Sequence, residues 1–324
     1  PDHRRWARGD ARGRARDGIV RAMRRTLRRW VTGLGLVALA VVVLALPVGA
    51  QDDAPPTVAV VPAPGGAWLV DAAGGVLALG DAVHHGGLTP FDLRSPVVGV
   101  AAHPSGEGYW SVAADGGVFA FGAAGFHGSM GGLPLNSPIV GMAAHPSGEG
   151  YWLVAADGGV FAFGAAGFHG SMGGLPLNSP MVGMAAHPSG EGYWLVAGDG
   201  GMFAFGTAGF RGSLGSLVLA APIVGATGAP GGDGYWLVAA DGGVFAFGAA
   251  PFVGSAAALA LDSPIVGIGP GAADGYLLTN RDGDVFAYGS VGYPGGRDGV
   301  DRAAPPGWRV AEAGRLGPGV EHLV

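Results

Sequence analysis

Gly150-Tyr-Trp-Leu-Val-Ala-Ala-Asp-Gly-Gly-Val-Phe-Ala-Phe-Gly164 is the stretch that decides the fold. It contains two short runs, 151–156 and 160–163, that are rich in the aromatic and β-branched residues favoured in strands. Asp157-Gly-Gly159 separates the runs, and an Asp-Gly pair supplies the positive φ angles that a tight hairpin requires. The stretch therefore predicts an antiparallel β-hairpin.

This hairpin recurs along the 324-residue chain. Its tryptophan returns every 42 residues through five copies, and Leu277 takes the sixth place at a spacing of 41. Segment 99–140 differs from segment 141–182 at only three positions, so these two units are recent duplicates. Two roles follow from the register. We expect the tryptophans to be core residues of the repeat (Trp68, Trp110, Trp152, Trp194 and Trp236) and the turn acids to be structural (Asp115, Asp157, Asp199, Asp241 and Asp282).

The faces of the strands indicate how the units pack. Residues 151, 153 and 155 point one way and residues 152, 154 and 156 point the other, so both faces are largely apolar. Radially stacked blades bury both faces, and units of 40–45 residues are typical of propeller blades. We predict an all-β, six-bladed β-propeller with three to four antiparallel strands per blade. A β-solenoid is the alternative, disfavoured because the hairpins reverse the chain.

Ring closure and blade number rest on the ends of the repeat array. The first strand, Thr57–Val61, is expected to pair with strands of the last unit, because a closed ring leaves no exposed edge. A possible fourth strand in each blade is marked by Ala166–Ser171. Trp308–Gly314 weakly resembles part of the repeat, so a propeller of seven blades is the alternative to one of six.

The pattern of the N-terminal region predicts an export signal. The basic stretch Met23–Trp30 is followed by the apolar run Val31–Leu46 and by small residues that end at Ala50, which predicts a signal peptide cleaved after Ala50. An uncleaved membrane anchor is the alternative, although about 20 residues are usual for a span. The Sec and twin-arginine routes both stay open. The predicted divisions are an upstream basic segment (1–22), the signal peptide (23–50), a linker (51–56), the propeller (57–296) and a tail or degenerate blade (297–324).

Composition excludes several classes of function. From Gln51 onward the chain has 7 Arg against 21 Asp and Glu, and this negative charge opposes nucleic-acid binding, which depends on phosphate neutralisation. There is no cysteine, so disulfides, thiolate metal sites and cysteine nucleophiles are excluded.

The units 108–122 and 150–164, each followed by Gly-Phe-His-Gly-Ser, resemble the tandem repeats of exported actinobacterial proteins. The resemblance covers about Thr57 to Gly296. It implies a propeller-like fold and an exported protein, and it carries no catalytic residues, since these repeats mostly have no assigned activity. The first unit departs from the pattern at Ala67, and the sixth departs from it at Leu277.

Histidines recur in register, and we interpret them as structural residues and not as metal ligands. One set lies before proline in Ser-Gly-Glu-Gly turns, and a second set lies before Gly-Ser in two units. Equivalent positions on different blades are displaced around a ring, whereas a metal site needs close convergence. We therefore expect no metal, no cofactor and no catalytic residue. The histidines expected to be structural are His103, His145, His187, His127 and His169, together with the His84-His85 pair.

Two functions from different classes follow. The favoured one is a secreted, non-catalytic binding or scaffold module, extracellular or attached to the cell wall, which is expected to be monomeric and free of membrane after signal cleavage. Its expected ligand is a cell-wall glycan or a surface protein, and the ligand-binding residues stay unassigned. The alternative is a glycan-cleaving or lactonase-type enzyme whose acids near the axial channel would come from Asp81, Asp92, Asp262 and Asp284.

Overall fold

The computed structural model describes residues 54–88, 93–271 and 274–296. The upstream segment 1–22, the expected signal peptide 23–50 and the tail 297–324 lie outside the described residues. All regular elements of the described residues are strands, arranged as six three-stranded antiparallel sheets. The strands are β1 (Thr57–Ala63), β2 (Gly66–Asp71), β3 (Val76–Gly80), β4 (Val97–Ala102), β5 (Gly108–Ala113), β6 (Val118–Gly122), β7 (Ile139–Ala144), β8 (Gly150–Ala155), β9 (Val160–Gly164), β10 (Met181–Ala186), β11 (Gly192–Ala197), β12 (Met202–Gly206), β13 (Ile223–Gly228), β14 (Gly234–Ala239), β15 (Val244–Gly248), β16 (Ile265–Pro270), β17 (Tyr276–Asn280) and β18 (Val285–Tyr288).

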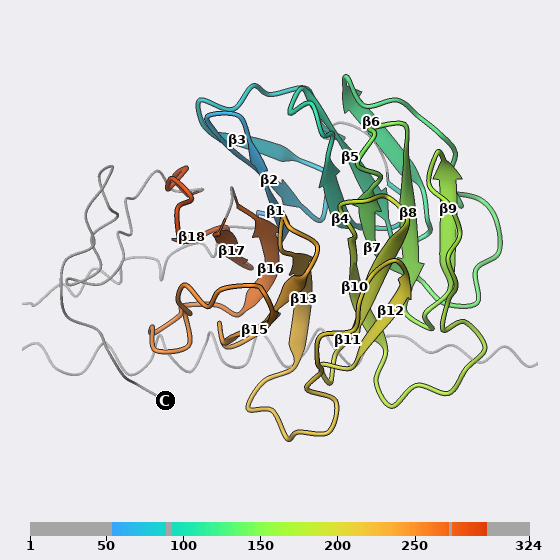
Figure 1. The fold of residues 1–324 in the computed structure, drawn as a ribbon. Coiled ribbons are helices and arrows are strands. Elements are labelled where there is room, and N and C mark those ends of the chain that lie inside the picture. The colour runs from blue at the N-terminus through green and yellow to red at the C-terminus, as the bar shows by residue number, and fades with distance from the viewer. Residues whose placement is uncertain (1–53, 89–92, 272–273, 297–324) are drawn as a thin grey trace, which may run out of the picture. The chain divides into compact units, whose positions relative to one another are not determined.

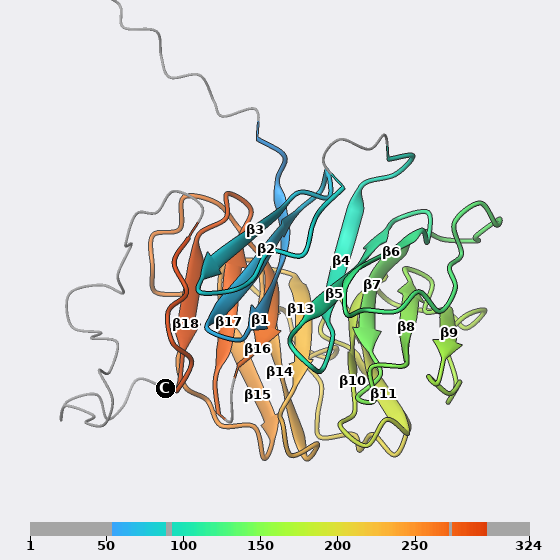
Figure 2. The same cartoon turned by 90° about the horizontal axis from the view of Figure 1, so that it is seen from above.

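The six sheets form the blades of a closed β-propeller. The first strands of the blades surround the centre in the order β1, β4, β7, β10, β13 and β16, and β16 contacts β1 to complete the ring (Figure 1). The third strands, such as β3, β6 and β9, lie at the periphery, and Figure 2 shows the blades from the side. The ring closes with six blades, and the hairpins within each sheet exclude a solenoid.

Burial of both sheet faces explains why each blade is apolar throughout. On one face of the third blade, Trp152 and Val154 pack against Tyr193 and Leu195 of the fourth blade, and all four side chains are buried. The same arrangement recurs at the next junctions around the ring. The 42-residue repeat is thus a repeat of packing interfaces as well as of strands.

Each blade has three strands, so the possible fourth strand is not formed. Segment 166–171 is irregular, and hydrogen bonds within it and directly after it tie it to its own blade. The Trp152 indole Nε1 donates to Gly167 O at 2.6 Å, and Met172 N donates to Gly158 O at 2.9 Å. The segment follows the blade edge without the continuous ladder that defines a strand.

The closing strand also differs from expectation. β1 pairs with β2 of its own blade along its whole length, and its register runs from Thr57 opposite Asp71 to Ala63 opposite Gly66. The last blade meets β1 through packing and one backbone hydrogen bond, from Thr57 N to Arg281 O. The ring therefore closes by contact between two complete blades, with no exchange of a strand.

The Asp-Gly-Gly hairpins connect the second and third strands. In the four middle blades the aspartate Oδ1 accepts a hydrogen bond of 2.9–3.0 Å from the backbone N–H two residues later, as an Asx turn requires. The acids are Asp115, Asp157, Asp199 and Asp241.

The sixth blade builds this turn differently from the sequence expectation. Asn280 Oδ1 accepts from Gly283 N and Asp284 N, so Asn280 occupies the capping role expected of Asp282. In the first blade Asp71 Oδ1 accepts from Ala73 N and Gly75 N. Both residues stand two places earlier in the repeat than the acids of the middle blades, and both belong to the blades that meet at the closure.

Candidate functional site

One end of the ring carries the turns that join the first and second strands of each blade. We call this end the proline face, because every one of these turns contains or directly follows a proline. The opposite end carries the Asp-Gly-Gly hairpins and is called the Asp-Gly face. Antiparallel pairing also brings the end of the third strand to the proline face, as Gly108 opposite Gly122 shows. The turns of the proline face are 63–66, 103–108, 145–150, 187–192, 229–234 and 270–275, of which 272–273 are not described.

Local hydrogen bonds shape three of these turns. In the second blade His103 Nδ1 lies 2.7 Å from Ser105 Oγ, and Ser105 Oγ accepts from Glu107 N at 3.1 Å. The third and fourth blades repeat this pattern with His145 and His187. Because the serine hydroxyl is engaged inside its own turn, the His-Ser pair reads as turn structure and not as a nucleophile with its base.

The same histidines also contact the neighbouring blade. The His103 ring lies 5.3 Å from the Trp110 ring of its own blade. A Cβ atom at Gly148, in the turn of the next blade, would collide with the His103 imidazole. His145 meets Gly190 and His187 meets Gly232 in the same way. These imidazoles are therefore spacers between successive turns, and glycine is required opposite them.

Buried aromatic side chains hold the segments that leave the third strands. The five predicted core tryptophans are 0–1% exposed, and each indole Nε1 donates to a carbonyl 15 residues later. Each tyrosine beside them reaches backwards to the preceding blade, as Tyr151 OH does to Gly128 O. Burial raises the pKa of these phenols above the ordinary value, and hydrogen bonds with the backbone oppose the rise, in Tyr109, Tyr151, Tyr193, Tyr235 and Tyr276.

A row of exposed phenylalanines lies on these anchored segments. Their side chains are 59–63% exposed, although the carbonyl just before each one, at 125, 167, 209 and 251, is fixed by the tryptophan of its blade. The first blade has His84 in this register and the sixth has Tyr293, which packs into the closing junction. The row consists of Phe126, Phe168, Phe210 and Phe252.

One acidic side chain per blade lies at the proline face. Five stand at the same place in the turns, and the first blade supplies Asp81, whose N–H donates to Gly65 O of its turn. All six are exposed. The Asp274 carboxylate accepts a hydrogen bond from Ser290 Oγ. The six acids are Asp81, Glu107, Glu149, Glu191, Asp233 and Asp274.

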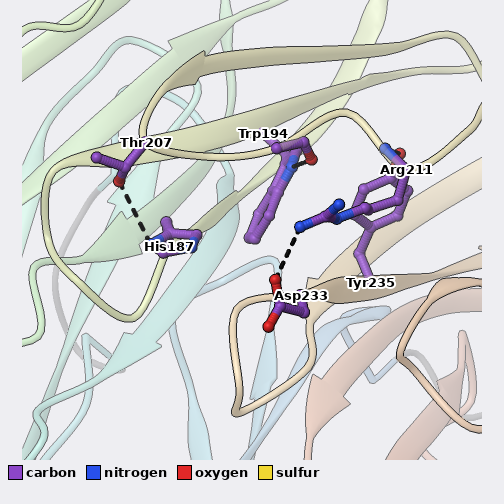
Figure 3. Close-up of polar contacts among 7 residues, drawn as sticks. His187, Trp194, Thr207, Arg211, Asp233 and Tyr235 are labelled. Atoms are coloured by element: carbon purple, nitrogen blue, oxygen red, sulfur yellow. Dashed lines mark hydrogen bonds and ion pairs between the residues drawn. The ribbon is translucent and has the colours of Figure 1, made fainter.

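An ion pair joins the fourth and fifth blades on this face. Arg211 Nη2 lies 2.7 Å from Asp233 Oδ1, and the Arg211 backbone N–H donates to Tyr235 OH (Figure 3). Thr207 lies beside His187 in the same view. Arg211 stands at the register place of His127 and His169 in the two preceding blades.

Histidines occupy that place in the first three blades. The rings of His127 and Tyr151 lie 5.7 Å apart, and the His127 backbone N–H donates to Tyr151 OH. The Nε2 atoms of His85, His127 and His169 are buried and have no hydrogen-bond partner among the described residues. Wedged between aromatic rings of two blades, these imidazoles pack the junction.

An axial cavity of about 480 Å³ lies among the first strands of the six blades. Its described lining is formed by Ala, Val, Met, Pro, Ile and Gly residues and by Thr227. These lining residues contain no carboxylate, so they do not supply the acid pair that a typical glycan-cleaving enzyme would need at the axis.

The candidate catalytic acids are placed apart. Asp81 lies on the proline face, whereas Asp262 and Asp284 lie in loops of the Asp-Gly face, where Asp284 Oδ2 accepts from Asn280 Nδ2. Asp92 lies outside the described residues. Within the described part of the chain, no group of three or more His, Asp or Glu side chains is placed to hold a metal ion.

None of the described residues forms a helix that is long and apolar enough to cross a membrane.

Several exposed residues were not predicted from the sequence to have a function. The exposed phenylalanines and the Arg211–Asp233 pair received no role, although Phe126 and its equivalents hold their register in four units. The signal was present in the exchange at the next position, where His127 and His169 give way to Arg211 while phenylalanine persists.

Comparison with known proteins found a likeness among solved structures alone. No family model matches the sequence, and no curated protein matches it. Among solved structures, the β-propeller domain of Myceliophteria thermophila Cps50 (Swd1) is similar with a TM-score of 0.47 and 9% sequence identity. The match covers 72% of this chain and 83% of that one.

Proposed function

We propose that this protein is a secreted, non-catalytic binding module that uses the proline face of a rigid propeller to hold a cell-wall glycan. The observation that carries the proposal is the row of phenylalanines that are 59–63% exposed on backbone anchored by buried tryptophans. Exposed aromatic rings add no burial to the fold of a monomer, whereas flat apolar rings beside polar turns suit the mixed surface of a sugar.

The segments that carry the phenylalanines are held rigidly, which supports ligand binding. Each segment that carries a phenylalanine is tied to its own blade by an indole hydrogen bond, and the segments of the second to fourth blades are also tied to the next blade through a tyrosine hydroxyl. A ligand therefore meets side chains on an ordered backbone, which lowers the entropy lost on binding. Repetition of the set around the ring suits a ligand that is itself a repeating polymer.

Binding of the purified protein to an array of cell-wall polysaccharides tests this function. The test variant replaces the four phenylalanines, at 126, 168, 210 and 252, by serine. The matched control replaces the similarly exposed Leu133, Leu175 and Leu217, which lie in loops of the Asp-Gly face, by serine. We expect binding to be lost in the phenylalanine variant alone, with the circular dichroism of both variants unchanged.

Two outcomes contradict the proposal. Equal loss in both variants would place binding elsewhere or in general apolar contact. Wild-type protein that binds no polysaccharide but binds a cell-surface protein through the same phenylalanines would replace the glycan with a protein ligand.

A further inference from the structure

The junctions between successive blades differ in the charge of one side chain. At the junction of the fourth and fifth blades, the Arg211 guanidinium occupies the space beside Asp233, with 2.7 Å between Nη2 and Oδ1. The two side chains are 40% and 71% exposed, so this cation lies at the surface of the proline face. The pair shows that a cationic group fits beside a turn acid, one residue along the chain from the exposed Phe210.

The three preceding junctions have an acid in the same register and have no arginine at the place of Arg211. Glu107, Glu149 and Glu191 stand in the register of Asp233, and all three are exposed. The place of Arg211 is taken by a packed histidine, and no ion pair to these three carboxylates is found among the described residues. An external cation can therefore reach the acids without breaking an existing pair.

Phenylalanine and carboxylate together favour an amine. The negative face of an aromatic ring attracts ammonium groups, and an exposed carboxylate adds a second weak attraction. Among the described residues Arg211 is the one arginine of the proline face, since Arg94 and Arg281 lie in turns of the Asp-Gly face. The face is therefore acidic and repels anionic polymers.

We propose that the proline face binds a polysaccharide of amine-bearing sugars, through carboxylate and phenylalanine sites repeated at successive blade junctions. This inference rests on the proposed function and narrows its ligand. Each site alone is weak, so useful affinity requires several sites to be filled by one chain. A stiff sugar polymer loses less conformational freedom on such a rigid array than a flexible basic peptide does.

Calorimetric titration of the purified protein tests this ligand with three probes. These are a six-unit chain of glucosamine, the same chain with every amine acetylated, and hexalysine. We expect the glucosamine chain to bind at least about tenfold more tightly than either of the other two. Replacing Glu107, Glu149 and Glu191 together by Gln should weaken glucosamine binding about tenfold and leave the acetylated chain unaffected.

The Arg211 junction supplies a matched gain-of-function variant. Arg211→His gives this junction the residue of the three others and frees Asp233, so we expect tighter binding of the glucosamine chain. Unchanged affinity in both the glutamine and the Arg211→His variants would overturn the inference.

The outcomes distinguish recognition of the amine from glycan binding in general. Equal binding of the amine and acetylated chains, lost in the phenylalanine variant, would leave the glycan-binding function intact and remove the amine. Hexalysine binding as tight as glucosamine binding would overturn the inference in favour of a basic peptide. Failure of every sugar chain to bind would count against both.

Discussion

The backbone N–H of Thr57 donates to the carbonyl of Arg281 across 2.8 Å and joins the first blade to the last. Each of the other five blades makes the equivalent bond at 2.9 Å. In each, a backbone N–H of the first strand donates to a carbonyl in the turn after the second strand of the preceding blade. The closing junction is therefore built like the five internal ones, which are Val97 to Ala72, Ile139 to Ala114, Met181 to Ala156, Ile223 to Gly198 and Ile265 to Ala240.

Deletion of Thr57–Val61 should open the ring. The deletion removes the closing hydrogen bond and Val60, which packs with Leu277 at the junction of the first and sixth blades. It also exposes the edge of β2, and unpaired edges promote aggregation. Light scattering after size exclusion should show oligomers and aggregates. A monomer with wild-type thermal stability would contradict closure through β1.

Gly158→Val should destabilise the third blade more than Gly174→Val. Both glycines have φ near +82°, so both variants carry the strain of a β-branched residue in the left-handed region. A Cβ at Gly158 would also lie 2.5 Å from Met172 Cβ, whereas a Cβ at Gly174 meets nothing within 4 Å. Chemical denaturation of the two variants separates the effect of the steric clash from that of backbone strain. Equal losses of unfolding free energy would disprove the packing of Met172 against this hairpin.

Ser111→Ala should stabilise the protein. Ser111 is fully buried and its hydroxyl has no partner among the described residues, whereas the third blade has Leu153 in this place. Removing an unsatisfied buried hydroxyl should raise the free energy of unfolding by about 1 kcal/mol. Leu153→Ala should instead lower it by about 2–5 kcal/mol. A loss on Ser111→Ala, measured by urea denaturation, would indicate a hydrogen bond to that hydroxyl.

Stability should fall at alkaline pH through Tyr288. Burial raises the pKa of Tyr288 to about 12, above the ordinary value of 10.0. Between these values the unfolded chain has released the proton that the folded chain keeps, so the free energy of unfolding decreases as pH rises. Tyr288→Phe should behave as wild type at pH 8 and be more resistant at pH 11, by about 1 kcal/mol after solvent screening. Identical pH profiles of thermal unfolding would show that Tyr288 does not titrate in this way.

Periodicity was enough to predict the blades and their number. The 42-residue spacing of the tryptophans and the apolar character of both strand faces require neighbours on each side, and six copies close one ring. The strand pairing at the closure was not predictable, because β1 satisfies its ladder within its own blade and meets β16 by packing.

The proposed binding face was harder to predict, because it lies outside the strands. In segment 123–130 no alternation distinguishes the exposed Phe126 from the half-buried His127, since both positions depend on the tryptophan and tyrosine that anchor the backbone. Similarly, Asn280 replaces Asp282 as the turn cap through a shift of two residues that the repeat register conceals.

Amide hydrogen exchange with and without saturating glucosamine chain tests most directly the claim that the proline face is the binding surface. Exchange reports local opening along the backbone, so it locates the contact on one end of the ring. We predict slower exchange in turns 103–108, 145–150 and 187–192 and in segments 123–128 and 165–170, with no change in hairpins 115–117, 157–159 and 199–201. Protection confined to the Asp-Gly-Gly hairpins, or absent from both faces at saturation, would contradict the account.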